Sequence, residues 1–97
     1  MTCLDKKLVK EAKIQFEKDF EKEIHELGYY LRPGITKIDI YYAIRPIVIY
    51  RDDKPPNSVM KQIENILPEV YPYKDQEIFV DETYYLPFLE EHDSNLC

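Results

Sequence analysis

Cysteine and glycine are scarce in this 97-residue sequence, with two of each, and tryptophan is absent. Disulfide frameworks and zinc modules need four thiols or a Cys/His set at fixed spacing, so Cys3 and Cys97 indicate neither. A phosphate-binding loop needs several closely spaced glycines, and the chain contains no Gly-x-Gly-x-x-Gly or Walker sequence. These absences argue against a disulfide-stabilised protein, a zinc module and a nucleotide-binding enzyme.

Long apolar runs are also missing. No stretch approaches the ~18 apolar residues of a membrane span, and residues 1–16 lack the apolar core of a secretory signal peptide. We therefore expect a cytoplasmic protein without a membrane partner. The reducing cytoplasm also favours free thiols over a disulfide.

Groups for catalysis are few, because His25 and His92 are the only histidines that could act as a base near neutral pH. Glu21 and His25 stand one helical turn apart, and 90-EEHD-93 places carboxylates around an imidazole. Neither set supplies the three or four ligands of a metal site. The remaining candidates, as carboxylates of a metal-dependent nuclease, are Asp39, Asp52 and Asp53. This pattern is unspecific, so we expect no catalytic residue, no metal site and no cofactor.

Residues 5–27 contain one apolar stripe with steps of four, four, four, four and three residues, which is close to the period of an α-helix. Gly28 stands where a left-handed cap would end that helix. Steps of four drift away from the 3.5-residue seam of a coiled coil, so we predict that the helix packs on a sheet. Its predicted core-facing residues are Leu8, Ala12, Phe16, Phe20, Ile24 and Leu27.

Residues 35–50 are dense in β-branched and aromatic side chains, which predicts strand structure. The apolar alternation changes parity near Arg45-Pro46, which predicts one inserted residue. Two interpretations fit: a hairpin with its loop near Arg45-Pro46, or one long strand that bulges at the proline. A single strand of about 15 residues would be far longer than usual, which favours two strands.

A second helix is predicted after the polar loop 51–57, with Asn57 or Ser58 as its cap and Pro68 and Pro72 closing it. Its apolar positions are Val59, Ile63, Ile66, Leu67 and Val70.

A last strand is predicted over residues 77–86, with Glu82 breaking its inward-facing row. The residues predicted to face inward are Ile78, Val80, Tyr84 and Leu86. Those predicted to face outward are Glu77, Phe79, Asp81, Thr83 and Tyr85. The order helix, strand, strand, helix, strand predicts an α+β fold with a mostly antiparallel three-stranded sheet and helices packed on one face. We expect a single domain over 1–97, with an ordered core over about 5–89 and an acidic tail over 90–97.

Positive charge is nearly absent from the last third of the sequence. Residues 62–97 hold nine acidic residues and one lysine, a formal charge of −8, whereas residues 1–61 carry +2. Solubility is the ordinary explanation of such an excess. Direct nucleic-acid binding is disfavoured because phosphate contacts need clustered Lys and Arg. The acidic third instead favours a basic protein as partner.

Tyrosine is abundant, with nine residues that include the pairs 29–30, 41–42 and 84–85. Neighbouring residues of a strand point to opposite faces, so we predict Tyr41 and Tyr85 to be exposed. Exposed tyrosine is typical of protein interfaces, where it adds contact area and a polar tip. The predicted partner-binding residues are Glu77, Asp81, Glu82, Tyr85, Glu90, Glu91, Asp93 and Tyr41.

These features predict a non-catalytic protein-binding module that inhibits or neutralises a basic, nucleic-acid-handling partner. Immunity proteins, antitoxins and DNA-mimicking phage inhibitors are of this physical type. The alternative is a structural or assembly subunit that forms a homodimer through its sheet edge. A metal-dependent enzyme is the third hypothesis.

Overall fold

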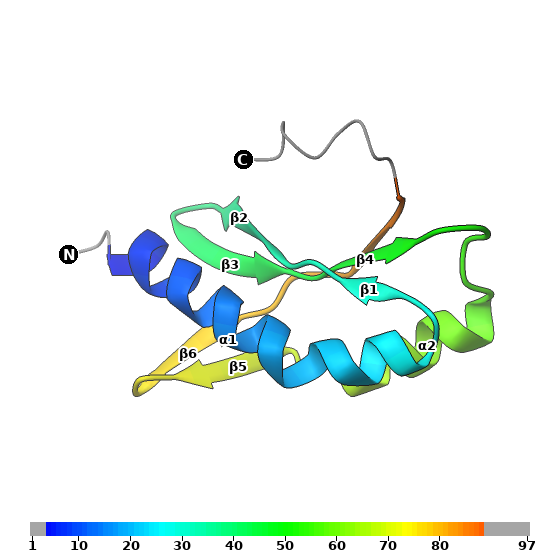
Figure 1. Cartoon of the computed structure of the whole chain (residues 1–97). Helices are drawn as coiled ribbons and strands as arrows, with labels where there is room; N and C mark the ends of the chain where they lie inside the picture. Colours follow the sequence, from blue (N-terminus) through cyan, green and yellow to red (C-terminus); the bar gives the residue numbers. More distant parts are fainter. Residues whose placement is uncertain (1–3, 89–97) are drawn as a thin grey trace.

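The computed structural model describes residues 4–88, which form two helices and seven short strands (Figure 1). The helices are α1 (Leu4–Glu26) and α2 (Asn57–Ile66); the strands are β1 (Tyr30–Leu31), β2 (Gly34–Ile38), β3 (Tyr41–Arg45), β4 (Ile47–Tyr50), β5 (Val70–Tyr73), β6 (Gln76–Phe79) and β7 (Tyr84–Pro87). The predicted α+β class is confirmed, although more and shorter strands are present than expected. Neither helix within residues 4–88 is long and apolar enough to cross a membrane.

The first four strands form one long antiparallel hairpin. Strand β2 pairs with β3, β1 pairs with β4, and the register is the same throughout, from Ile38 opposite Tyr41 to Tyr30 opposite Ile49. The hairpin is interrupted between the β2–β3 pair and the β1–β4 pair, where the register sets Pro33 opposite Pro46. Because proline has no N–H, the break leaves no amide donor without a partner at that point.

The predicted hairpin loop or bulge near Arg45-Pro46 is wrong in position. The chain turns at Asp39-Ile40, and Asp39 has a φ of 60°, a backbone conformation that aspartate tolerates better than most residues. The constant register shows that no residue is inserted at Pro46. Strands β3 and β4 are therefore one arm of the hairpin, interrupted by the proline.

The predicted last strand is divided into β6 and β7, and its second half has the opposite orientation to the one predicted. Ile44 forms a parallel bridge with Val80, and Ile47 pairs with Tyr84. Between these two pairs, the β3–β4 segment advances by three residues and the β6–β7 segment by four. One extra residue therefore bulges between β6 and β7 and reverses which side chains face the core. Tyr84 and Leu86, predicted to face inward, are exposed.

Helix α2 begins at Asn57, as expected, but Pro56 is its N-cap, and no side chain caps the helix. The prediction that Asn57 or Ser58 would cap it is wrong. The sequence analysis also missed strand β5, where Val70 is exposed and lies outside the helix. Strands β5 and β6 are joined by Lys74-Asp75, both with positive φ, the conformation of a type I′ hairpin turn.

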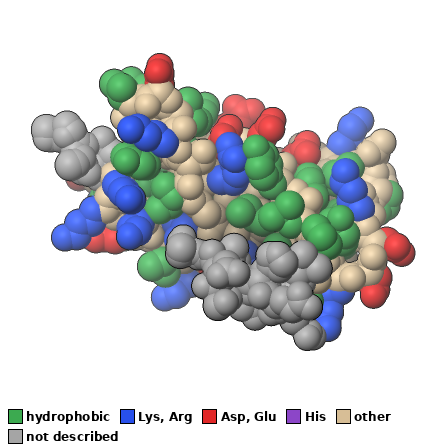
Figure 2. All heavy atoms as spheres, turned by 90° about the horizontal axis from the view of Figure 1, so that it is seen from above, with side chains coloured by type: hydrophobic (Ala, Val, Ile, Leu, Met, Phe, Trp, Pro, Cys, Tyr) green, Lys and Arg blue, Asp and Glu red, His purple; other side chains and the backbone are tan. Residues whose placement is uncertain are grey.

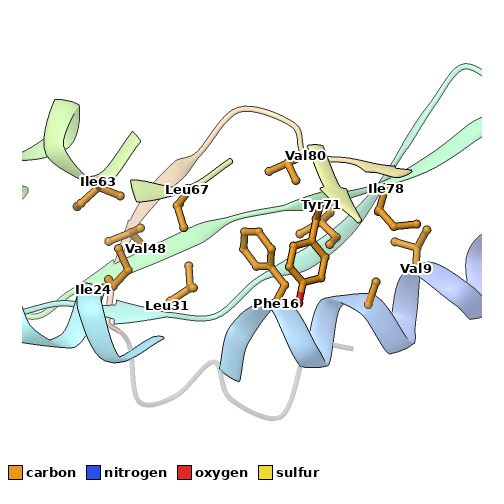
Figure 3. Packing of buried hydrophobic residues seen from close by; sticks show 12 residues of the cluster. Val9, Phe16, Ile24, Leu31, Val48, Ile63, Leu67, Tyr71, Ile78 and Val80 are labelled. Carbon is orange, nitrogen blue, oxygen red and sulfur yellow. The ribbon is translucent and has the colours of Figure 1, made fainter. Parts of the chain in front are cut away.

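The predicted stripe on α1 is confirmed. Phe16 and Ile24 are fully buried, and all six predicted positions belong to the hydrophobic core or pack against it. Figure 3 shows Phe16 beside Tyr71 of β5, with an edge-on ring contact at a centroid separation of 5.3 Å. The Tyr71 hydroxyl donates a hydrogen bond to Asp19 of α1. From α2, Ile63 reaches the same core.

In Figure 1, α2 and the later turns of α1 lie below β3 and β4, whereas the first turns of α1 are level with β3. Figure 2 shows the molecule from above, where hydrophobic side chains gather across the middle and most Lys and Arg side chains lie toward the two ends. Apolar surface thus remains on the side of the sheet that the helices leave uncovered.

Candidate functional site

The described acidic residues of the predicted site differ in their surroundings. Glu77 and Glu82 are exposed, whereas the carboxylate of Asp81 accepts a hydrogen bond from the guanidinium of Arg45. That hydrogen bond lowers the pKa of Asp81, and the same contact raises the pKa of Arg45. Arg45 also stacks over the ring of Tyr84, with 4.1 Å from Cζ to the ring centroid. Asp81 is therefore engaged within the fold, where it joins β3 to the bulge after β6.

Tyr85 faces inward, so the prediction that it is exposed is wrong. Its side chain packs against the core, and its hydroxyl lies 3.2 Å from a carboxylate oxygen of Glu64 and 3.4 Å from the carbonyl oxygen of Met60. Burial raises the pKa of Tyr85, and the negative charge of Glu64 raises it further. The bulge between β6 and β7 explains the error, because it makes Tyr84 the outward member of the pair.

The remaining acidic positions of the predicted site, Glu90, Glu91 and Asp93, lie outside the described residues, as do His92 and both cysteines. Within residues 4–88, no three His, Cys, Asp or Glu side chains come together in a way that could hold a metal ion. Glu21 instead pairs with Arg32, and His25 lies beside the ring of Tyr30.

Tyr41 and Glu77 are brought together in a shallow groove of about 410 Å³. Tyr41 is 63% exposed, as predicted, and Phe79 beside it is 54% exposed. The groove lies between the β2–β3 hairpin and β6, and its lining residues are Ile38, Tyr41, Tyr42, Ala43, Glu77 and Phe79. Glu77 is the one acidic residue in a lining that is otherwise aromatic and aliphatic.

Strand pairing determines which side chains line this groove. The bridge between Ile44 and Val80 places β6 alongside β3 and buries both of these residues in the core. Side chains one position away point to the opposite face, so Ala43 and Phe79 both face the groove side, where Phe79 is exposed and Ala43 is fully buried. Ala43 has no exposed surface, so Tyr41 and Phe79 supply the exposed aromatic part of the groove lining.

Ile40 adds to the apolar surface near this groove. It occupies the turn of the β2–β3 hairpin and is 75% exposed. Turn positions are usually Gly, Asn, Asp or Ser, because those residues suit the backbone and the solvent. An isoleucine there gains little from the core, because it is mostly exposed.

Phe79 and Ile40 were absent from the predicted site, although the sequence contained indications of both. The alternation over 77–86 correctly predicted that Phe79 faces outward, and an outward phenylalanine is a better contact candidate than a carboxylate near it. Ile40 was placed inside a strand because no glycine or asparagine marked the turn. The position of Phe79 beside β3 depends on the pairing of distant segments, which local pattern does not specify.

Comparison with known proteins gives no match: no family model, curated protein or solved structure is significantly similar to this chain. Evidence on function therefore comes from the groove and its surroundings.

Proposed function

We propose that this protein is a non-catalytic protein-binding module that docks a basic partner through the groove between β3 and β6. The observation that carries the proposal is the pair of exposed aromatic side chains, Tyr41 and Phe79, on a groove whose floor includes Ala43. Aromatic residues dominate the energy of protein interfaces because each offers a large, rigid contact area. The mostly apolar groove that they line suits an apolar side chain of a partner.

The charge near the groove defines the chemistry of that partner. Glu77 lies in the groove lining and Glu82 is exposed beyond β6. The sequence from residue 62 onward, taken as a whole and without reference to its position, has a formal charge of −8. We expect the groove to accept an apolar side chain flanked by Lys or Arg. A small acidic protein that covers such a basic surface would compete with nucleic acid for it, which is the mode of action of an inhibitor or neutraliser.

The test begins with capture of partners from the native host, followed by binding measurements on purified variants. Tyr41→Ala and Phe79→Ala should each weaken binding at least tenfold, mainly through faster dissociation. Leu86→Ala is the matched control, because Leu86 is an exposed apolar residue on β7, outside the groove. Glu77→Gln should slow association, and the difference from wild type should shrink as salt rises.

Two results would argue against this function. If Leu86→Ala weakens binding as much as Phe79→Ala, the groove is not the docking site. If captured partners are acidic, or if association is insensitive to salt, the acidic third serves solubility and the basic-partner hypothesis fails.

A further inference from the structure

Helix α1 exposes a lysine-rich stripe on the side opposite its core face. Lys7, Lys10, Lys18 and Lys22 are all exposed and follow one another at helical spacing, with Ile14 in the middle. Ile14 is 55% exposed and is not part of the hydrophobic core. Lys18 and Lys22 stand four residues apart, a like-charge pair that weakens a helix by a few tenths of a kcal/mol. Local helix stability therefore does not explain the stripe.

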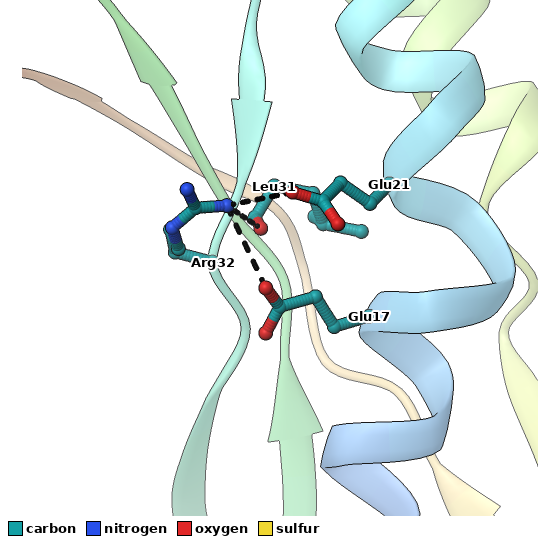
Figure 4. A network of polar contacts seen from close by, with 4 residues as sticks. All are labelled: Glu17, Glu21, Leu31 and Arg32. Atoms are coloured by element: carbon teal, nitrogen blue, oxygen red, sulfur yellow. Dashed lines mark hydrogen bonds and ion pairs between the residues drawn. The ribbon is translucent and has the colours of Figure 1, made fainter.

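Four carboxylates of α1 are engaged with residues of other elements. Figure 4 shows Glu17 and Glu21 turned toward Arg32, at 3.6 and 3.2 Å from its Nη1 atom. Glu11 pairs with Lys74 at the tip of the β5–β6 hairpin. Asp19, another α1 carboxylate, accepts the hydrogen bond of the Tyr71 hydroxyl. Four acids of α1 are thus engaged on the flanks of the helix.

Lys10 and Lys18, by contrast, have no ion-pair partner among the side chains that the structure describes, those of residues 6–88. No carboxylate of these residues lies within 4.0 Å of either amine. These two residues stand one turn before and one turn after Ile14, about 6 Å away along the helix axis. The stripe therefore presents an apolar side chain with a free positive charge on each side.

We propose that the groove between β3 and β6 of one molecule binds the α1 stripe of a second copy of this chain, with Ile14 inserted between Tyr41 and Phe79. This inference rests on the proposed function, because it uses the same groove and names one occupant of it. The chemistry of the stripe matches the groove: an apolar side chain flanked by lysines meets a mostly apolar groove with Glu77 in its lining. A helix laid into an apolar groove is a common mode of recognition.

Such an association is head to tail, because the stripe and the groove are different surfaces. Each dimer retains one unused stripe and one unused groove, so further copies can add until a ring closes. One helical stripe in a shallow groove covers less than the ~1,200 Å² of stable complexes, so the contact is weak and reversible. A molecule whose groove is filled in this way cannot dock its partner, so concentrated protein is held in a self-inhibited form.

Sedimentation velocity on the full chain measures the association directly. We expect the weight-average mass of wild type to rise between ~10 μM and ~1 mM protein, the range of weak contacts. The rise should diminish when salt is increased from ~50 to ~500 mM, because the lysine and carboxylate charges are screened. Wild-type protein that stays monomeric throughout would overturn the inference.

Two variants separate head-to-tail association from a symmetric dimer. Ile14→Glu inactivates the stripe and Phe79→Ser inactivates the groove, so each protein alone should remain monomeric. Mixed in equal amounts, they should form a one-to-one dimer and nothing larger, because one intact stripe and one intact groove remain. Circular dichroism of each variant checks that it is folded. A variant that fails this check is replaced by the milder Ile14→Ala or Phe79→Ala.

The outcomes distinguish this inference from the proposed function. A mixture of the two variants that stays monomeric would overturn the head-to-tail contact. Dimers of either variant alone would also overturn it, and would point instead to pairing through a sheet edge. Ile14→Glu should bind the captured partner at least as well as wild type, because its groove is intact and no longer occupied. Weaker partner binding by Ile14→Glu would contradict competition for the groove, whereas loss by Phe79→Ser alone would leave the proposed function standing.

Discussion

Two groups of aromatic residues lie on this small fold, and their surroundings differ. In the first, Phe16 of α1 meets Tyr71 of β5, both are buried, and the Tyr71 hydroxyl donates to Asp19. In the second, Tyr41 and Phe79 are more than half exposed on the groove between β3 and β6. The comparison separates aromatic side chains that stabilise the fold from those free to contact another molecule.

The Tyr71 hydroxyl shows that the first group is engaged within the fold. Burial raises the pKa of the Tyr71 hydroxyl, and its hydrogen bond to the Asp19 carboxylate raises it further. Substitutions in the first group should therefore reduce the free energy of unfolding. Substitutions in the second group should change binding while leaving stability nearly unchanged.

The largest expected effect is on the core. Phe16→Ala should lower the free energy of unfolding by about 3 to 5 kcal/mol, because it opens a cavity under the fully buried ring. Phe20 is only partly buried, so Phe20→Ala should cost less. Urea denaturation of both variants measures the difference. A loss below about 1 kcal/mol for Phe16→Ala would contradict the assignment of the first group to stability.

The ion pair between Arg45 and Asp81 should have an intermediate effect. Asp81→Asn should lower stability by about 1.5 to 3 kcal/mol, the usual value of a hydrogen bond to a charged group. Because the pKa of Asp81 is lowered in the folded state, the pair stabilises fully above the unfolded value of about 3.9 and is lost as pH falls through the folded value. The stability difference between wild type and Asp81→Asn should vanish at low pH. A difference that persists there would show that the ion pair is not its source.

A smaller effect distinguishes the two tyrosines of β7. Tyr85→Phe should lower stability by about 0.5 to 1.5 kcal/mol, because it removes the hydroxyl that contacts Glu64 and the Met60 carbonyl. Tyr84→Phe is the matched control, since the Tyr84 ring is exposed and its contact with Arg45 does not need the hydroxyl. Thermal unfolding of the two variants should show a lower midpoint for Tyr85→Phe alone. A lower midpoint for Tyr84→Phe alone would instead support the prediction from sequence that Tyr85 faces outward.

The smallest effect on stability is expected in the groove. Phe79→Ser should change the free energy of unfolding by no more than about 0.5 kcal/mol, because the ring is more than half exposed. Urea denaturation at constant pH measures this change. A loss above about 2 kcal/mol would place Phe79 among the residues that hold the fold together.

Local periodicity was sufficient to predict α1 and the core face of α2. The α1 stripe needed only the spacing of residues such as Phe16 and Ile24, because a helix repeats within a few residues. Ile78 and Val80 were likewise predicted to be buried from the alternation along β6. These features depend on short-range geometry, which is present in the sequence itself.

Features that depend on strand pairing were not predicted. The bulge between β6 and β7 arises from pairing with β3 and β4, and it reversed the orientation of Tyr85. The turn at Asp39-Ile40 carries no glycine, so the hairpin was placed too late. For the site, Tyr41 and Glu77 were predicted correctly as exposed residues, but Phe79 joins them only through the pairing of distant segments.

The most direct test of the central claim is site-specific photo-crosslinking in the native host. A benzophenone amino acid replaces Phe79 in the groove or, as the control, Leu86 on β7; both positions are exposed and apolar. We expect the probe at position 79 to give a discrete crosslink to a basic protein, and the probe at position 86 to give none. Equal crosslinking from both positions, or none from position 79, would contradict the claim that the groove between β3 and β6 is the docking site.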